Sequence, residues 1–132
     1  MDLQHISIGT THVVEVEVTP ALTAQAMGSG QLSVYATPAM VALMEQAAML
    51  AVQPMLPQGY GTVGVELNVQ HTRATPVGTR VQAQATLLEV DGRRLVFEVV
   101  ASDAQGAIGK GTHVRYIIDN EKFMNKVQGV HS

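Results

Sequence analysis

Over the stretch 18–65 the chain carries a single charged residue, Glu45. It lies within an almost wholly apolar segment, residues 37–53, whose pattern predicts a helix. Thr37 suits the N-cap of this helix, and Pro38 suits its first turn. Burying an unpaired charge is costly, so a carboxylate in such a helix must reach solvent, be paired or take part in chemistry.

Four segments after this helix alternate apolar and polar residues, as strands with one buried face do. A similar segment precedes the helix and is followed by a stretch without a strong period. The expected elements besides the helix are a first strand at 6–19, a loop or lid at 20–35, strands at 62–74, 79–90, 93–103 and 107–118, and a short C-terminal helix at 119–127.

This order predicts a single α+β domain over residues 1–132. An antiparallel sheet has one face to cover, and a helix that is apolar nearly all round suits a position wrapped by a curved sheet. A curved antiparallel sheet around one long central apolar helix resembles the hot-dog fold.

Charged residues make up 14% of the chain, well below the usual share of about 25%. We therefore expect part of the surface to be covered by a second copy. The net charge of −3 gives no reason to expect a nucleic acid or an anionic membrane as partner. The absence of cysteine excludes disulfides, a thiolate nucleophile and cysteine-ligated zinc. No signal peptide or membrane span is evident, so a cytoplasmic protein is expected.

The residues one turn from Glu45 on the helix are all apolar, namely Val41, Ala42, Ala48 and Met49. Desolvation there would leave the carboxylate reactive as a base or a nucleophile. Thr37 lies two turns earlier, where free backbone N–H groups suit an oxyanion or a phosphate. The structural alternative is that Thr37 is only a cap and that Glu45 lies at the surface or pairs across a dimer.

Three further polar residues follow on the strands. His71, at the end of the strand after the helix, can hydrogen-bond a thioester carbonyl or move a proton, although a structural hydrogen bond explains it equally. His113 and Arg115 share one face of the last strand, and Arg115 can bind a phosphate or be an ordinary solvated residue. His5, His12 and His131 show no metal-ligand spacing, so no metal is expected.

Four segments together resemble the fluoroacetyl-CoA thioesterase-like branch of the hot-dog acyl-CoA thioesterases: ATPAMVALME at 36–45, GTVG at 61–64, HTRATPVG at 71–78 and GKGTHVR at 109–115. The resemblance implies a catalytic set of Thr37, Glu45 and His71. It also implies that the backbone of Gly64 lies near the thioester and that Arg115 lies near the coenzyme A phosphates.

The resemblance further implies a homodimer with its sites at the subunit interface. Coenzyme A would enter as part of the substrate, and no separate cofactor is expected. The fluoroacetyl-specific enzyme has an aromatic-rich lid, whereas residues 21–34 here contain no phenylalanine. A plain small acyl-CoA is therefore the expected substrate class.

Hydrolysis of an acyl-CoA thioester is the leading hypothesis. In it Glu45 acts as base or nucleophile, Thr37 positions or relays, and His71 stabilises the oxyanion or protonates the leaving thiolate. One alternative is a non-catalytic domain that binds acyl-CoA or another metabolite, which needs no poised Glu45. Another is a hot-dog enoyl-CoA hydratase or dehydratase, whose base must face the carbon beside the carbonyl.

Overall fold

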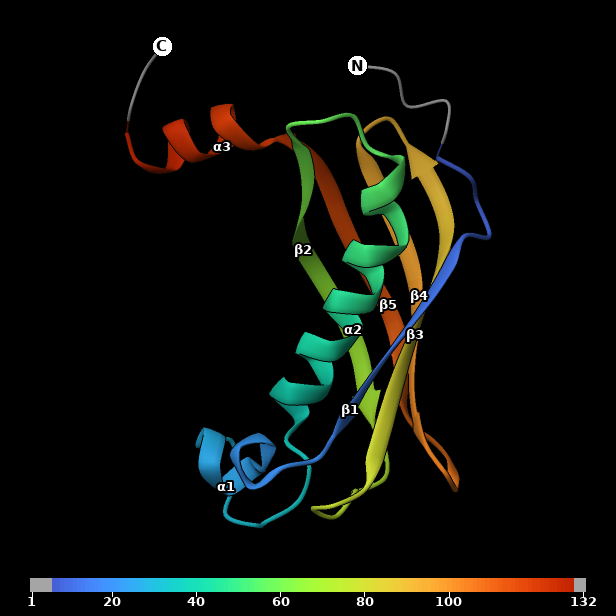
Figure 1. The fold of residues 1–132 in the computed structure, drawn as a ribbon, viewed down its shortest axis with the longest axis vertical. Helices are drawn as coiled ribbons and strands as arrows, with labels where there is room; N and C mark the ends of the chain where they lie inside the picture. The colour runs from blue at the N-terminus through green and yellow to red at the C-terminus, as the bar shows by residue number, and fades with distance from the viewer. Residues whose placement is uncertain (1–5, 130–132) are drawn as a thin grey trace.

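The computed structural model describes residues 6–129, so His5 and His131 lie outside the described residues. One antiparallel sheet packs against one long helix, α2 (Figure 1). The strands are ordered β1-β3-β4-β5-β2, so β1 and β2 form the two edges of the sheet that these residues build. The strands are β1 (Thr11–Glu17), β2 (Tyr60–His71), β3 (Arg80–Asp91), β4 (Arg94–Asp103) and β5 (Gly106–Asp119). The helices are α1 (Ala24–Met27), α2 (Thr37–Val52) and α3 (Asn120–Val127), with short 3-10 turns at Pro20–Leu22 and Gln53–Met55.

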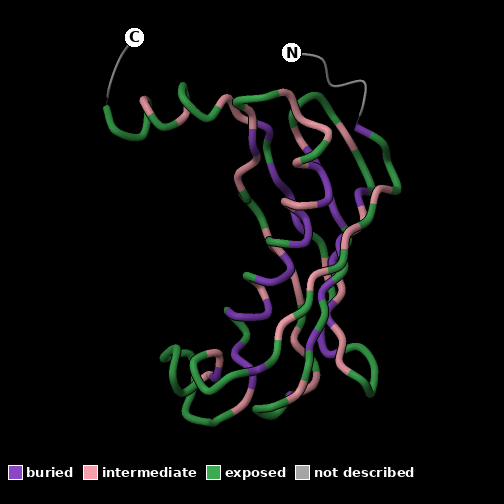
Figure 2. Tube along the Cα trace, in the orientation of Figure 1, coloured by how far each residue is buried: buried purple, intermediate pink, exposed green. Residues whose placement is uncertain are grey.

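The core lies between α2 and one face of the sheet, and Figure 2 shows it as a continuous buried layer. Alternation along the strands supplies the sheet side of this layer, with Leu95, Phe97 and Val99 fully buried on β4. On α2 the buried residues are Ala39, Met40, Leu43, Met44, Ala47, Ala48, Ala51 and Val52. The predicted α+β hot-dog architecture is therefore confirmed.

The face of α2 that this core leaves uncovered is also largely apolar. Pro38, Ala42 and Gln46 are exposed, and Val41 and Met49 are only half-buried. A soluble single chain has no need for so apolar an outer helix face, and this face also carries Glu45.

The start of α2 differs from the prediction. Ala36 occupies the N-cap position and Thr37 is already helical, so the expectation of a Thr37 cap is wrong. No side chain caps this end of the helix. Because its hydroxyl is not used by the helix, Thr37 is free to bond elsewhere.

Two strands differ clearly from their predicted bounds: β1 (Thr11–Glu17, predicted 6–19) is shorter at both ends, and β2 (Tyr60–His71, predicted 62–74) begins and ends earlier. The first was expected from residue 6, but residues 7–10 form a turn in which Thr10 N–H bonds Ser7 O, and β1 begins at Thr11. The second was expected to reach residue 74, but β2 ends at His71. It ends there because Thr72 and Arg73 both direct their N–H groups to the Ile108 carbonyl, which breaks the regular ladder.

The predicted lid contains the turn at Pro20–Leu22 and the single helical turn α1. It folds back on itself through hydrogen bonds from Ala36 N–H to Leu22 O and from Ala24 N–H to Val34 O. The chain thus returns to the start of α2 beside the segment that follows β2.

At the other end of the molecule α3 projects past the β2 edge of the sheet (Figure 1). Its Asp119 side chain accepts a hydrogen bond from Lys122 N–H as an N-cap, and Met124 and Val127 are exposed. None of the helices between residues 6 and 129 is long and apolar enough to cross a membrane.

Candidate active site

Thr37 and His71 meet where the start of α2 faces the end of β2. The Thr37 hydroxyl lies 2.8 Å from His71 Nδ1, within hydrogen-bond distance. These residues are thirty-four positions apart in the chain, so the fold itself creates the pair. They line one pocket of about 250 Å³ together with Ala24, Ser29, Val34, Tyr35, Thr72, Arg73 and Ala74.

His71 is held as a neutral imidazole. Burial lowers its pKa below the ordinary 6.5, against the opposing effect of a hydrogen bond to the Arg73 backbone. Its Nε2 is buried without a hydrogen-bond partner among the described residues. A buried polar atom left unpaired usually marks a place where a bound molecule completes the hydrogen bonding. The neutral ring can therefore accept the Thr37 proton at one nitrogen and serve a ligand at the other.

Tyr35 forms the wall behind this pair. Its ring meets the His71 ring edge-on, with centroids 6.4 Å apart and an interplanar angle of 78°. The residue is 2% exposed, and burial raises the pKa of its hydroxyl to about 12. On its other side Tyr35 borders an apolar pocket of about 220 Å³ lined also by Val16, Leu22, Met27, Ala39, Ala42, Leu43 and Gln46.

Glu45 belongs to a second cluster, at mid-helix. Its side chain is 43% exposed, and its Oε2 lies 3.8 Å from Nη1 of Arg115 on β5. The desolvation expected from its apolar helix neighbours is not seen in the single chain, and the sheet brings a cation to the carboxylate. Glu45 is both paired and open to solvent in the single chain.

Arg115 is buried and bonded on several sides. Its Nε donates to the Thr62 hydroxyl at 2.8 Å, and its Nη2 donates to the Thr62 carbonyl at 2.9 Å. Burial lowers its pKa, while the charge of Glu45 raises it. At 7% exposure the residue is not a solvated strand arginine. Its guanidinium faces Glu45 in the single chain.

His113 completes this cluster from the same face of β5, as strand alternation predicted. Arg115 Nη1 lies 3.3 Å from its Nε2, and because arginine can only donate, Nε2 must be the accepting nitrogen. Its Nδ1 then carries the proton and donates to the Glu66 carbonyl at 2.8 Å. Burial lowers the pKa of His113, and the neighbouring Arg115 charge adds to this, against the Glu66 hydrogen bond and Glu45. His113 is therefore a neutral, fixed tautomer.

Gly64 leaves the space beside the sheet that the Glu45 carboxylate occupies. A Cβ at this position would lie 2.8 Å from Glu45 Oε2, 3.0 Å from His113 Cε1 and 3.2 Å from Arg115 Nη1. The register of β2 against β5 shifts immediately after it, between Gly64 and Glu66, as at a β-bulge. Glycine thus leaves this cluster in place, whereas an added Cβ would require the Glu45 carboxylate to shift.

The two clusters are separate within one chain. Thr37 and Glu45 are eight residues apart on α2, which corresponds to about 12 Å along the helix axis. The hydrogen bond and the ion pair of these residues join Thr37 to His71 and Glu45 to Arg115, and not one pair to the other. The predicted residues therefore form two groups: Thr37 with His71, and Glu45 with Gly64 and Arg115.

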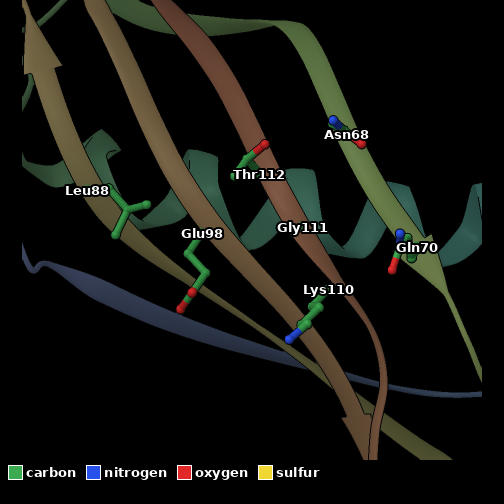
Figure 3. A pocket seen from close by; sticks show the side chains of 7 residues that line it. All are labelled: Asn68, Gln70, Leu88, Glu98, Lys110, Gly111 and Thr112. Carbon is green, nitrogen blue, oxygen red and sulfur yellow. The ribbon is translucent and has the colours of Figure 1, made fainter.

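A further depression, of about 350 Å³, lies on the face of the sheet away from α2 (Figure 3). Its lining is Asn68, Gln70, Leu88, Glu98, Lys110, Gly111 and Thr112. None of the predicted site residues borders it, and we do not assign it to the chemistry. Between residues 6 and 129 no group of three acidic or histidine side chains is placed to hold a metal ion.

Comparison with known proteins identifies the family. The sequence profile of the fluoroacetyl-CoA-specific thioesterases matches residues 18–121. The fluoroacetyl-CoA thioesterase of Streptantibioticus cattleyicolor is 47% identical over 95 residues, which cover 72% of this chain and 68% of that protein. The chain belongs to the fluoroacetyl-CoA-specific thioesterase family.

Solved structures agree with this assignment. A structure of a fluoroacetyl-CoA thioesterase superposes on this thioesterase with a TM-score of 0.88 and 37% identity, covering 96% of this chain and 98% of the other. A variant solved in complex with acetyl-CoA has a TM-score of 0.89 at 37% identity, covering 94% and 98%. A thioesterase superfamily member from Thermus thermophilus has a TM-score of 0.88 at 29% identity, covering 96% and 93%. The predictions of a hot-dog fold and of an acyl-CoA thioesterase are confirmed.

Sequence reasoning missed several residues of the site in this thioesterase. Thr62 and the Glu66 carbonyl, which hold Arg115 and His113, gave no signal beyond their place on an alternating strand. Tyr35 was treated as the end of an unstructured lid. His113 was placed beside Arg115, but its contact with the Glu45 cluster depends on the β2–β5 register, which sequence periodicity does not provide.

Proposed function

We propose that this protein hydrolyses the thioester of a small acyl-CoA to the free acid and coenzyme A, using Thr37 and His71 together with Glu45. The observation that carries the proposal is the 2.8 Å contact between the Thr37 hydroxyl and His71 Nδ1. A hydroxyl spared from helix capping and bonded to a neutral imidazole is the arrangement that polarises an oxygen for acyl chemistry.

In this proposal Glu45 acts on the carbonyl carbon, either by deprotonating a water or by attacking directly. Arg115, whose Nη1 lies 3.8 Å from Glu45 Oε2, holds the carboxylate in place. His71 supplies a hydrogen bond to the developing oxyanion or a proton to the leaving sulfur. Water adds across the acyl–sulfur bond, so the acid takes the oxygen and coenzyme A leaves as the thiol. We propose that no resident cofactor or metal takes part.

We propose that complete sites form between two copies of the chain, since the two clusters start from positions about 12 Å apart along the axis of α2. Two features support a homodimer with its sites at the interface. The strand β2 is an open edge of the described sheet, with Val65 55% exposed at its bulge. The helix face that carries Glu45 is apolar and uncovered. A second copy joined at β2 would cover this face and supply the missing cluster.

The substrate class follows from the relatives and from the site. Related thioesterases are named for fluoroacetyl-CoA, and one was solved with acetyl-CoA bound. We propose a small, plain acyl group for this chain. The pocket beside His71 is about 250 Å³, and its lid side carries Ala24, Ser29 and Val34, with Tyr35 as its one aromatic lining residue and no phenylalanine.

A free-thiol release assay over acetyl, fluoroacetyl, branched and aromatic acyl-CoAs tests the reaction. We expect His71→Ala to lose at least about 100-fold in turnover, as removal of an oxyanion donor does, with its melting temperature retained. His12→Ala on β1, a half-buried histidine remote from the pocket, is the matched control and should retain full turnover. Near-normal turnover by His71→Ala would refute the proposal. Hydration of an enoyl-CoA without thiol release would instead favour a hydratase.

Mixed dimers test where the sites lie. One chain carries Glu45→Gln, and its differently tagged partner carries Thr37→Ala with His71→Ala. If each site takes its two clusters from different chains, the mixed dimer has one intact site and about half of the wild-type activity, while both parent homodimers are inactive. An inactive mixed dimer would show that each site lies within one chain.

A single turnover in ¹⁸O-labelled water separates the two roles of Glu45. Direct attack by the carboxylate forms a Glu45–acyl anhydride as the thiolate leaves. If water then attacks the Glu45 carboxyl carbon, the first product acid carries unlabelled oxygen and Glu45 takes the label. An unlabelled first product therefore shows direct attack, whereas a labelled one shows that water added at the acyl carbon.

A further inference from the structure

Asp103, the last residue of β4, is a buried carboxylate that belongs to neither cluster. Its side chain is 6% exposed. Its Oδ1 accepts from Arg73 Nη2 at 2.6 Å and from the Gln105 backbone N–H at 2.9 Å, and its Oδ2 accepts from the Thr75 hydroxyl at 3.3 Å. Two of its three partners lie in the segment 72–76, which immediately follows His71.

Arg73 ties this segment to the β4–β5 turn at two further points. Its Nη1 donates to Gln105 Oε1 at 2.9 Å, and its Nη2 donates to the Gly106 carbonyl at 2.9 Å. With Thr72 and Arg73 N–H also bonded to the Ile108 carbonyl, the chain leaving His71 is held from its first residue.

The segment 72–76 also contacts the chain just before Thr37, whose hydroxyl is the partner of His71 in the active-site hydrogen bond. The carbonyl of Thr75, a fully buried residue, accepts from Tyr35 N–H at 2.8 Å, and Val34 bridges to Pro76. Tyr35 stands two residues before Thr37. Contacts of residues 72–76 therefore hold both the segment that leads into Thr37 and the segment that follows His71.

The hydrogen bonds around Asp103 favour its ionised form. Burial acts to raise its pKa, but the Gln105 N–H, the Arg73 guanidinium and the Thr75 hydroxyl outweigh burial and hold the pKa below its ordinary value of 3.8. The carboxylate therefore remains ionised at neutral pH and keeps its three charge-assisted hydrogen bonds.

We propose that Asp103 is a positioning residue of this enzyme, which acts through Arg73 and Thr75 to hold His71 and the Thr37 hydroxyl at hydrogen-bond distance. The proposal rests on the function proposed above for His71 and Thr37. Asp103 does not touch the substrate, and its effect reaches the site through the backbone of residues 72–76.

The kinetic test compares Asp103→Asn with Arg73→Ala and Arg73→Lys. We expect Asp103→Asn and Arg73→Ala to lower kcat about 10- to 100-fold, as small misplacements of catalytic groups do, while KM changes by no more than about twofold. Arg73→Lys keeps a cation beside Asp103 and should recover kcat to within about threefold of wild type. Arg80→Ala, which removes the exposed pair with Glu15 at 3.6 Å on β1 and β3, is the matched control and should leave both constants unchanged.

The pH profile supplies a readout that lost stability alone would not move. When the segment 72–76 loosens, His71 becomes better hydrated, so the acidic limb of kcat should move up toward pH 6.5. In wild type and Arg80→Ala this limb should stay at lower pH. Assays well below each melting temperature keep the unfolded fraction out of the comparison.

Two results would overturn the inference. One is wild-type kcat with an unmoved acidic limb in Asp103→Asn while His71→Ala is inactive. The other is equal kcat in Arg73→Ala and Arg73→Lys, which remains informative if Asp103→Asn does not fold. If His71→Ala itself keeps near-normal turnover, it is the proposed function that fails.

Discussion

The two clusters along α2 are held in different ways. Thr37 and His71 form one hydrogen bond between groups at the start of a helix and the end of a strand, and contacts between loops set their distance. Glu45 and Arg115 lie at mid-helix and mid-strand, where the β2–β5 register and the guanidinium contacts to Thr62 fix them. The first cluster therefore depends on the loop contacts of residues 34–36 and 72–76, whereas the second depends on the β2–β5 register.

Of the changes considered, Gly64→Ala should disturb the Glu45–Arg115 cluster most strongly. Its new Cβ would meet Glu45 Oε2 at 2.8 Å and must displace the carboxylate. Turnover should fall by up to about 100-fold in the thiol-release assay, since a misplacement near 1 Å can cost that much. Gly61→Ala is the matched control, because its Cβ would meet Asn120 Oδ1 at the same 2.8 Å, but beside α3. Equal losses in both variants would contradict the special role of Gly64.

Arg115→Met tests whether the Arg115 side chain acts on Glu45 or on the coenzyme A phosphates. We expect kcat to fall about tenfold or more and the free energy of unfolding to drop by about 1–3 kcal/mol, because Thr62 and His113 lose buried hydrogen bonds. The loss should be equal for acyl-CoA and for the matching acyl-pantetheine, which lacks the nucleotide phosphates. A loss confined to acyl-CoA and seen in KM would instead support the phosphate role expected from the sequence.

The Thr37–His71 pair should determine how turnover depends on pH. Burial lowers the pKa of His71, so its neutral form persists below pH 6.5. Turnover should therefore stay constant as the pH falls to 6.5 and decline only as the pH passes through the lowered pKa. The folded state binds this proton less readily than the unfolded chain, so stability from this group is lost in the same direction. A rate that already declines between pH 8 and 7 would contradict a neutral His71.

Thr37→Val sharpens the contrast between stability and activity. Because Ala36 is the N-cap, removal of the Thr37 hydroxyl should change the free energy of unfolding by less than about 0.5 kcal/mol, while turnover falls. A loss near 1 kcal/mol, measured by urea denaturation, would indicate a capping role after all.

Periodicity was sufficient for the architecture. Alternation in β3 and β4 and the long apolar run of α2 identify their elements and the buried faces, since burial on one side of a strand leaves a period of two in the sequence. The ends were less predictable. Whether Thr37 caps the helix depends on the path of the lid, and the end of β2 depends on the carbonyl of Ile108, a residue far along the chain.

The site could be predicted in part. The apolar surroundings of Glu45 on its own helix singled it out, and spacing placed His113 and Arg115 on one face. Their burial beside Glu45 follows from which face β5 turns to α2, and no local pattern reveals that. Asp103 looked like an ordinary turn residue, because the arginine that it binds lies thirty positions away.

The two edges of the sheet are unequally suited to joining another chain. β1 has seven residues with two exposed glutamates, Glu15 and Glu17, beside Val13, whereas β2 runs twelve residues with Val65 and Glu66 exposed at its bulge. Charge on a short border discourages strand addition. If two copies meet edge to edge at β2, as proposed above, the two like edges close into a pair and leave no free β2 edge from which a fibre could grow.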